Sequence, residues 1–129
     1  MLKFPSFRTW YLIMALSCWA FVIVLVYLAD IGQVGHYFGA FYQYPGGDKI
    51  GHFLMMGLLS LCSNLALGGR QVRLMGRLWL LGSLLVWGVV FLEECSQYWF
   101  ALRTCSLLDL LADTLGIWLG GRLALKMRR

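Results

Sequence analysis

Four long runs of mostly apolar residues account for more than half of the 129-residue chain. They extend over about 10–29, 50–67, 78–97 and 107–125. The hydrocarbon core of a bilayer is about 30 Å thick and requires about 20 residues of α-helix. We therefore predict an all-α fold in which four transmembrane helices form one bundle with short loops. Because little chain remains outside these runs, 1–129 is expected to be a single integral membrane domain.

The first run could instead belong to a signal peptide, since Lys3 and Arg8 precede it. Its apolar stretch is longer than the usual signal core of about 7–15 residues, and no convincing small-residue cleavage site follows. We expect a span that stays in the protein. With 60% hydrophobic and only 13% charged residues, the composition is far from that of a soluble globular domain.

The positive charges indicate an orientation. Nine of the eleven Lys and Arg residues lie near the two termini or in the middle loop: Lys3, Arg8, Arg70, Arg73, Arg77, Arg122, Lys126, Arg128 and Arg129. By the positive-inside rule, these segments are cytoplasmic. This distribution explains the net charge of +5 without a nucleic-acid partner, and an even number of spans agrees with both termini being inside.

The acidic residues have the opposite distribution. All six fall near the predicted extracytoplasmic ends of the runs: Asp30, Asp48, Glu93, Glu94, Asp109 and Asp113. The two remaining cations, Lys49 and Arg103, fall there as well. We therefore expect a polar site open to the extracytoplasmic leaflet.

The stretch YPGGDKIGHFLMM places charged residues at the start of the second run. Asp48 and His52 are spaced i and i+4, which places both on one helix face. Asp48 also follows a Pro-Gly-Gly turn, so it could simply cap the helix. His52 could act in chemistry, or could be satisfied by an ordinary interhelical hydrogen bond.

The third run carries Glu94 and Gln97 at i and i+3, again on one face. Glu93 points roughly 100° away and is expected to reach the solvated interface. The fourth run opens with Asp109 and Asp113 at i and i+4. A carboxylate at the centre of a span costs about 2.5 to 3.5 kcal/mol on insertion scales, so such residues usually face a bundle interior and mark function.

Gly116 and Gly120 continue the spacing of the two aspartates, and we expect them to let helices pack closely. One shared site is the simplest way to satisfy the polar pairs of three runs. A structural network of hydrogen bonds and salt bridges is the alternative. Five carboxylates against Lys49 and Arg103 leave three negative charges, to be relieved by protonation, by charging His52 or by a bound cation.

Taken together, these residues resemble the signature of the VanZ-like family of bacterial membrane proteins. The resemblance covers 48–121 and consists of DKxxHF from Asp48 to Phe53, then ExxQ at Glu94 and Gln97, then Arg103, Asp109, position 113, Gly116 and Gly120. Arg103 lies six positions after Gln97, Asp109 six positions after Arg103, residue 113 four positions further on, and Gly116 three positions after that.

The resemblance implies which residues form the site: Asp48, Lys49, His52, Glu94, Gln97, Arg103, Asp109 and position 113. It also implies a location in the bacterial inner membrane and a link to resistance against teicoplanin, a glycopeptide that acts on cell-wall precursors. It supplies no molecular activity. The family usually has Asn where this chain has Asp113, and Pro-Gly where Ala101 and Leu102 precede the arginine.

Two further features lie near this site. Cys95 and Cys105 are both expected at the outer surface, where a disulfide could close the loop that carries Arg103. Cys18 and Cys62 are expected to be apolar packing residues. The aromatic loop around Tyr37 and Phe41 is spaced as a short helix, and is either an interfacial belt or a flap over the site that could include His36.

The leading functional hypothesis is recognition of an anionic lipid headgroup or a cell-envelope lipid intermediate. Arg103 and Lys49 would contact phosphate, with Asp109 and Glu94 holding them in place, and Gln97 is a further ligand-binding candidate. Membrane lipids, a cell-wall lipid precursor or a glycopeptide are the expected partners, and a homodimer would be unsurprising.

Two alternatives belong to other classes of function. In the first, the chain is a hydrolase or transferase acting on a lipid-linked phosphate, in which His52 pairs with Asp48 for acid–base work and Asp113 is its complement. In the second, it is an assembly protein whose polar cluster is purely structural. The sequence does not identify a cofactor, and neither a nucleophile motif nor a phosphate-binding glycine loop is present in it.

Overall fold

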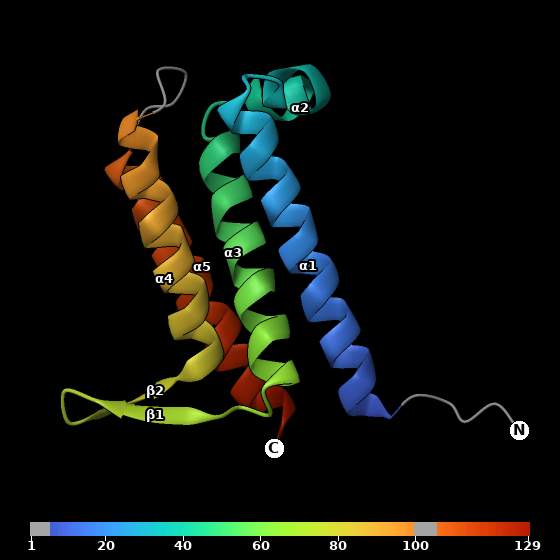
Figure 1. Ribbon diagram of the computed structural model, residues 1–129, viewed down its shortest axis with the longest axis vertical. Helices are drawn as coiled ribbons and strands as arrows, with labels where there is room; N and C mark the ends of the chain where they lie inside the picture. The colour runs from blue at the N-terminus through green and yellow to red at the C-terminus, as the bar shows by residue number, and fades with distance from the viewer. Residues whose placement is uncertain (1–5, 100–105) are drawn as a thin grey trace, which may run out of the picture.

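The computed structural model describes residues 6–99 and 106–129, and within these ranges it is predominantly helical. The helices are α1 (Phe7–Asp30), α2 (Val34–Tyr42), α3 (Gly47–Ala66), α4 (Leu81–Ser96) and α5 (Leu107–Met127), and the 3-10 turn η1 (Gln97–Trp99) follows α4. The long helices alternate in direction, so α1 begins and α5 ends at the same end of the bundle, while the short α2 lies across the other end (Figure 1).

Local signals explain where these helices begin. The side chain of Ser6 accepts a hydrogen bond from the backbone N–H of Thr9, and that of Ser106 accepts one from the backbone N–H of Asp109. Helix α3 begins after Gly46, whose φ of 76° suits glycine. Asp48 therefore does not occupy the capping position, but lies in the first turn, where its charge complements the helix dipole.

A β-hairpin replaces the start of the predicted third run. Strands β1 (Gln71–Leu74) and β2 (Arg77–Leu80) pair antiparallel, and Met75 and Gly76 form the turn with φ values of 50° and 77°. Two positive φ values match the twist of a tight hairpin. As a result α4 begins at Leu81 rather than near residue 78, and its 16 residues extend only about 24 Å.

By length and composition, α1 is the one helix among the described residues that qualifies to cross a membrane. This helix has 24 residues, most of them apolar. Helices α3 and α5 are long enough, with 20 and 21 residues, but they carry the polar and charged residues of the predicted site. Helix α4 is shorter.

Glycines set the distance between α3 and α5. A Cβ atom added at Gly116 would overlap the carbonyl oxygen of Phe53, and one added at Gly120 would overlap that of Gly57. The two backbones are therefore in direct contact, which only residues without a side chain permit. This confirms the predicted packing role of Gly116 and Gly120. We call this region, formed by Gly57, Gly116 and Gly120, the glycine contact.

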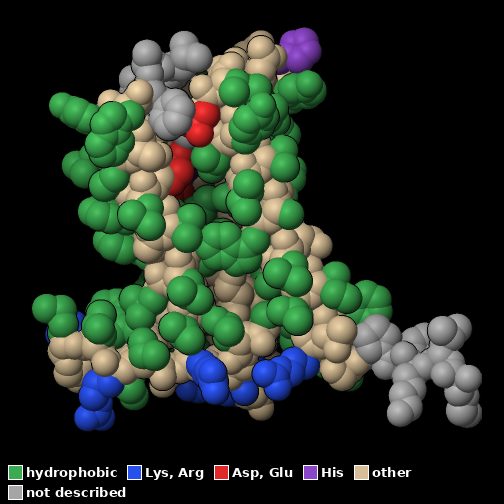
Figure 2. Space-filling view, viewed as in Figure 1, with side chains coloured by type: hydrophobic (Ala, Val, Ile, Leu, Met, Phe, Trp, Pro, Cys, Tyr) green, Lys and Arg blue, Asp and Glu red, His purple; other side chains and the backbone are tan. Residues whose placement is uncertain are grey.

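The interior combines an apolar cluster with a buried polar network. Val22, Leu59, Val86, Val90 and Ile117 form the cluster. Toward the hairpin end, the Ser60 hydroxyl donates to the carbonyl of Ile117 at 2.8 Å, and the Asn64 amide donates to the Ser83 hydroxyl at 2.8 Å. Much of the exterior is apolar, with many hydrophobic side chains exposed along the helices (Figure 2).

Candidate functional site

Positive and negative side chains are separated along the bundle. In Figure 2, Lys and Arg side chains lie at the end that carries the hairpin, and acidic side chains are visible in a hollow toward the end that carries α2. The prediction that the acidic residues gather at one end of the fold is confirmed, because the C-terminal end of α1 and the N-terminal ends of α3 and α5 lie together there (Figure 1).

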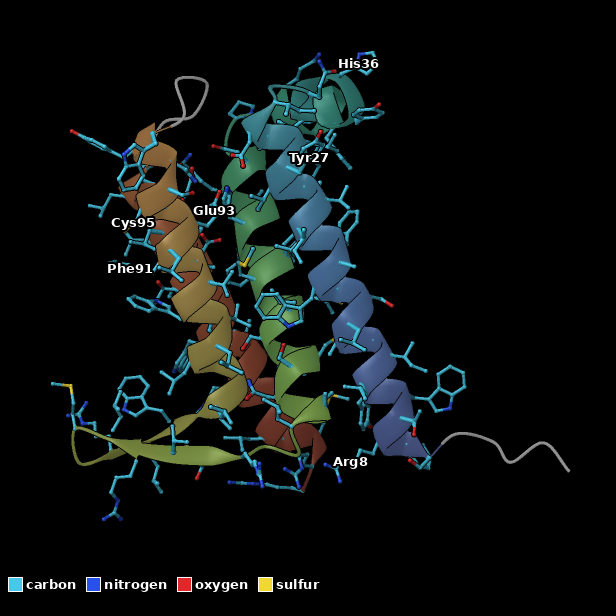
Figure 3. All side chains as sticks on the ribbon, viewed as in Figure 1. Arg8, Tyr27, His36, Phe91, Glu93 and Cys95 are labelled. Atoms are coloured by element: carbon cyan, nitrogen blue, oxygen red, sulfur yellow. The ribbon has the colours of Figure 1, made fainter. Side chains whose placement is uncertain are left out.

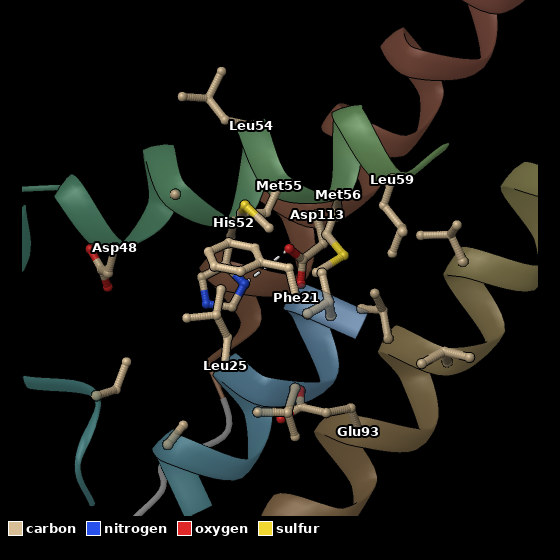
Figure 4. Close-up of a pocket in the computed structure, with 18 of the residues that line it drawn as sticks. Phe21, Leu25, Asp48, His52, Leu54, Met55, Met56, Leu59, Glu93 and Asp113 are labelled. Carbon is tan, nitrogen blue, oxygen red and sulfur yellow. Dashed lines mark hydrogen bonds and ion pairs between the residues drawn. The ribbon is translucent and has the colours of Figure 1, made fainter. Parts of the chain in front are cut away.

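His52 of α3 and Asp113 of α5 form the innermost polar pair. His52 Nδ1 and Asp113 Oδ1 are 2.9 Å apart, and Asp113 is only 2% exposed (Figure 4). The second ring nitrogen, Nε2, lies 4.0 Å from Asp109 Oδ2. The predicted pairing of His52 with Asp48 is therefore wrong. The imidazole reaches across the close contact between α3 and α5 to Asp113, while the carboxylate of Asp48 bonds to Lys49.

Lys49 links the two helices nearer the end of the bundle. Its Nζ lies 2.7 Å from Asp48 Oδ2 and 3.2 Å from Asp109 Oδ1. Lys49 therefore bridges two carboxylates, one on its own helix and one on α5. The side chain of Lys49 is 36% exposed, which leaves its ammonium group accessible from outside.

Helix α4 contributes a separate pair of carboxylates. The amide of Gln97 donates to Glu93 Oε2 at 2.9 Å and to Glu94 Oε1 at 3.3 Å. Glu94 and Gln97 are buried, at 5% and 4% exposure, as their shared face predicts. Glu93 is half-buried and lines a cavity, so its predicted position at the solvated interface is wrong. The cavity lies between α1 and α4, and the face of α4 that carries Glu93 is turned toward it.

A cavity of about 350 Å³ lies among α1, α2, α3 and α4. We call it the lateral cavity. Its polar lining comes from Asp48, His52, Glu93 and Asp113, and the remaining lining is almost wholly apolar. Figure 4 shows Glu93 approaching from α4 on one side and the His52–Asp113 pair on another, with Phe21 and Leu25 of α1 beside them. The volume falls in the range of about 300 to 1,000 Å³ common to ligand pockets.

The short helix α2 lies over this cavity. Phe38 and Phe41 line it, and a Cβ atom added at Gly51 would lie 3.2 Å from the ring of Phe41. The predicted short helix is confirmed, and its aromatic residues take the position that the flap hypothesis requires. His36 is exposed and points away from the cavity, packing edge-to-face on Tyr37 (Figure 3).

The structure thus brings together five of the predicted site residues between α3 and α5: Asp48, Lys49, His52, Asp109 and Asp113. Glu94 and Gln97 bond to each other on α4. Arg103 and Cys105 lie outside the described residues. Cys95 is exposed, and the predicted disulfide stays a prediction because Cys105 is not among the described residues. Within 6–99 and 106–129, no group of three His, Cys, Asp or Glu residues is arranged to hold a metal ion.

Two parts of the interior were missed from the sequence. The apolar lining from α1, including Phe21, Leu25 and Ala29, carries no signal beyond general hydrophobicity. The Ser60–Asn64–Ser83 network does carry one, because small polar residues spaced three or four apart in an apolar helix are typical of helix contacts.

This architecture defines a class: a small helical-bundle protein in which ionisable side chains from neighbouring helices meet beside an apolar cavity. The sequence profile of the VanZ/LLP1 family matches residues 2–127, nearly the whole chain, and the chain belongs to this family. The resemblance found in the motif residues is thereby confirmed. Searches of curated proteins and of solved structures gave no significant match.

Proposed function

We propose that the chain is a multi-pass protein of the bacterial inner membrane that binds an amphiphilic lipid in the lateral cavity. In this proposal α1, α3, α4 and α5 are the four spans and both termini are cytoplasmic. The alternating directions of the long helices, the apolar exterior and the basic residues gathered at one end all support it. The short α4 is compatible with it, since bilayers thin locally around short spans.

Fusions test the topology directly. Alkaline phosphatase is active only outside the cytoplasm, so it should be active when inserted after Tyr44 and inactive when fused after Arg129. Green fluorescent protein at the C-terminus should fluoresce. An active phosphatase at the C-terminus would contradict the orientation.

The cavity itself suggests the kind of ligand. It joins a large apolar lining from α1 and α4 to a polar region at His52 and Asp113. A molecule with a hydrocarbon chain and a polar head satisfies both parts at once, whereas a free polar solute would leave the apolar part unfilled. This combination is the single observation that carries the proposal.

The polar lining suggests the chemistry of the head. Asp48, Glu93 and Asp113 offer carboxylate oxygens, which accept hydrogen bonds from hydroxyl or amide donors. The accessible ammonium of Lys49, together with Arg103, would contact phosphate. A phosphate that carries a hydroxyl-rich head has both features, and lipid intermediates of the cell envelope are of this kind. Such a ligand would also connect the protein to glycopeptide resistance.

Native mass spectrometry of gently solubilised protein tests the proposal. The wild type should retain an identifiable lipid, and Lys49→Gln and Arg103→Ala should each lower its occupancy at least about tenfold, since charge-assisted hydrogen bonds are lost. Lys126→Gln removes an equal charge at the other end of the bundle and should change nothing. Retention of the same lipid by all variants would contradict the proposed head contacts.

The His52–Asp113 pair supports a second candidate, acid–base chemistry on the same lipid. An imidazole held at 2.9 Å by a buried carboxylate has its orientation fixed, as a general base requires. In that case, His52→Gln should abolish turnover of a lipid-linked phosphate while leaving the lipid bound. Purified protein that never converts such lipids, although His52→Gln still loses the cellular phenotype, would reject this candidate.

A purely structural role for the polar cluster makes a different prediction. The same substitutions would then lower the melting temperature in detergent instead of changing lipid retention. Measuring lipid retention, lipid turnover and melting temperature on Lys49→Gln, His52→Gln and Lys126→Gln separates the three functions.

A further inference from the structure

Three arginines from distant parts of the chain converge at the hairpin end of the bundle. Arg8 comes from the first turn of α1, Arg70 from the segment between α3 and β1, and Arg128 from the residue after α5. With Ala66, Leu67 and Gly68 they line a second cavity of about 520 Å³. We call it the arginine pocket. It lies at the opposite end from the lateral cavity and shares no lining residue with it.

No carboxylate among the described residues forms an ion pair with these arginines. The ion pairs within 6–99 and 106–129 join Lys49 and His52 to Asp48, Asp109 and Asp113, all at the other end. Guanidinium groups stay charged at every physiological pH. Three of them around one hollow repel each other, and this repulsion would be relieved by an anion.

The backbone beside the pocket fixes the position of one of the arginines. Gly68 and Gly69 have φ values of 66° and 64°, and their N–H groups donate to the carbonyls of Leu65 and Asn64 at the end of α3. A Cβ atom added at Gly69 would overlap the guanidinium of Arg128. The left-handed turn therefore leaves space that the Arg128 side chain occupies, so this arginine packs against the end of α3 instead of extending freely from α5.

From this geometry we infer that the arginine pocket binds one phosphate group, which joins the start of α1, the turn after α3 and the end of α5. Arginine presents its donors in a planar fork that matches the oxygens of phosphate, and several forks arriving from different directions can surround a tetrahedral anion. The phosphate could belong to a lipid headgroup or be free in solution. The inference is independent of the ligand proposed for the lateral cavity.

Titration calorimetry of the full chain in non-ionic detergent tests this inference with two probes at constant ionic strength. One probe is inorganic phosphate, and the other is a short-chain phosphatidylglycerol. Arg8→Gln, Arg70→Gln and Arg128→Gln should each weaken binding by about tenfold or more. Arg70→Lys keeps the charge but not the fork, and should also weaken binding. Arg73→Gln is the matched control, because it removes an equal charge from exposed β1, outside the pocket.

The outcomes distinguish a site for free phosphate from a site for a lipid headgroup, and both from diffuse electrostatic attraction. Binding of both probes, or of inorganic phosphate alone, identifies a site for the phosphate group itself, and binding of the lipid alone identifies a headgroup site. An equal loss of affinity in Arg73→Gln and Arg70→Gln would overturn the inference, because diffuse electrostatic attraction would explain it. Failure of the wild type to bind either probe would overturn it as well.

Discussion

Helix α3 meets its neighbours in two contrasting ways. Against α5 it makes backbone contact through Gly57, Gly116 and Gly120, and the ion pairs of Lys49 and His52 cross the same interface. Toward α1 and α4, side chains line the lateral cavity at the α2 end of the bundle, whereas α4 approaches the backbone of α3 closely near the hairpin, where Gly82 lies against Asn64. The difference indicates that α3 and α5 form a fixed support for the polar residues, while α1 and α4 form the sides through which a ligand would enter.

Hydrogen bonds support this division. Helix α1 is joined to α3 by the indole N–H of Trp19, which donates to the Ser63 hydroxyl at 3.1 Å, and α4 is joined to α5 by Trp87, whose indole donates to Thr114 at 3.2 Å. Helix α4 is also bonded to α3, because the Asn64 amide donates to the Ser83 hydroxyl at 2.8 Å. Each of these side-chain bonds is worth about 1 kcal/mol. They attach the flanking helices to the α3–α5 support through side chains.

The largest expected effect comes from breaking the glycine contact. Gly120→Leu would force its side chain against the backbone of α3 at Gly57 and should cost about 3 kcal/mol of unfolding free energy, the upper part of the usual range for overpacking. Gly88→Leu is the matched control, since a Cβ atom at Gly88 meets nothing within 4 Å. Unfolding in detergent by added sodium dodecyl sulfate measures both. Equal stability of the two variants would show that the contact is not tight.

A smaller loss should follow from removing the partner of His52. Asp113→Leu leaves the imidazole without its 2.9 Å hydrogen bond and should cost about 2 kcal/mol. Asp113→Asn keeps an oxygen acceptor and should cost less than about 1 kcal/mol. The same unfolding assay ranks the two variants. If Asp113→Asn is as damaging as Asp113→Leu, the negative charge matters, and the hydrogen bond alone does not explain the pair.

Loosening α1 should have a modest effect on stability. Ser63→Ala removes the acceptor of the Trp19 indole and should cost about 1 kcal/mol. Because α1 lines the lateral cavity, lipid exchange should become faster while the α3–α5 support keeps its stability. Stopped-flow measurement of the release of a fluorescent lipid analogue tests this, with Ser17→Ala on exposed α1 as control. Unchanged release would show that α1 does not limit access.

The smallest effect should come from the ion pair between Asp48 and Lys49. Both side chains are 36% exposed, so solvent screening keeps the pair weak. Asp48→Asn should therefore lower the unfolding free energy by less than about 1 kcal/mol, and added salt should remove most of the difference from the wild type. A loss as large as that of Asp113→Leu in the same unfolding assay would contradict this expectation.

Much of this arrangement could be predicted from spacing along the helices. Asp109, Asp113 and the two glycines follow one another at intervals of four, three and four residues, which places them on one face, so their joint approach to α3 follows from helix geometry. Glu94 and Gln97 are buried together for the same reason. Hydrophobic and polar periodicity predicts which residues share a face, because that depends on the geometry of a single helix.

What could not be predicted depends on more than one helix. The partner of His52 is decided by how closely α5 approaches, and the sequence near Asp48 contains no information about that distance. The position of Glu93 was predicted wrongly because the cavity that it lines is formed by residues of several helices, including α1 and α4. The hairpin was missed because the apolar residues of β2 continue directly into α4, so hydropathy shows one uninterrupted run.

Filling the lateral cavity tests whether it holds the hydrocarbon chain of an amphiphilic lipid, as proposed. Ala29→Trp places an indole into the cavity from α1, and Ala20→Trp makes the same change on an exposed part of that helix. Native mass spectrometry of both should show the wild-type lipid retained by Ala20→Trp and lost from Ala29→Trp, with similar melting temperatures. Equal retention by the two variants would contradict the claim.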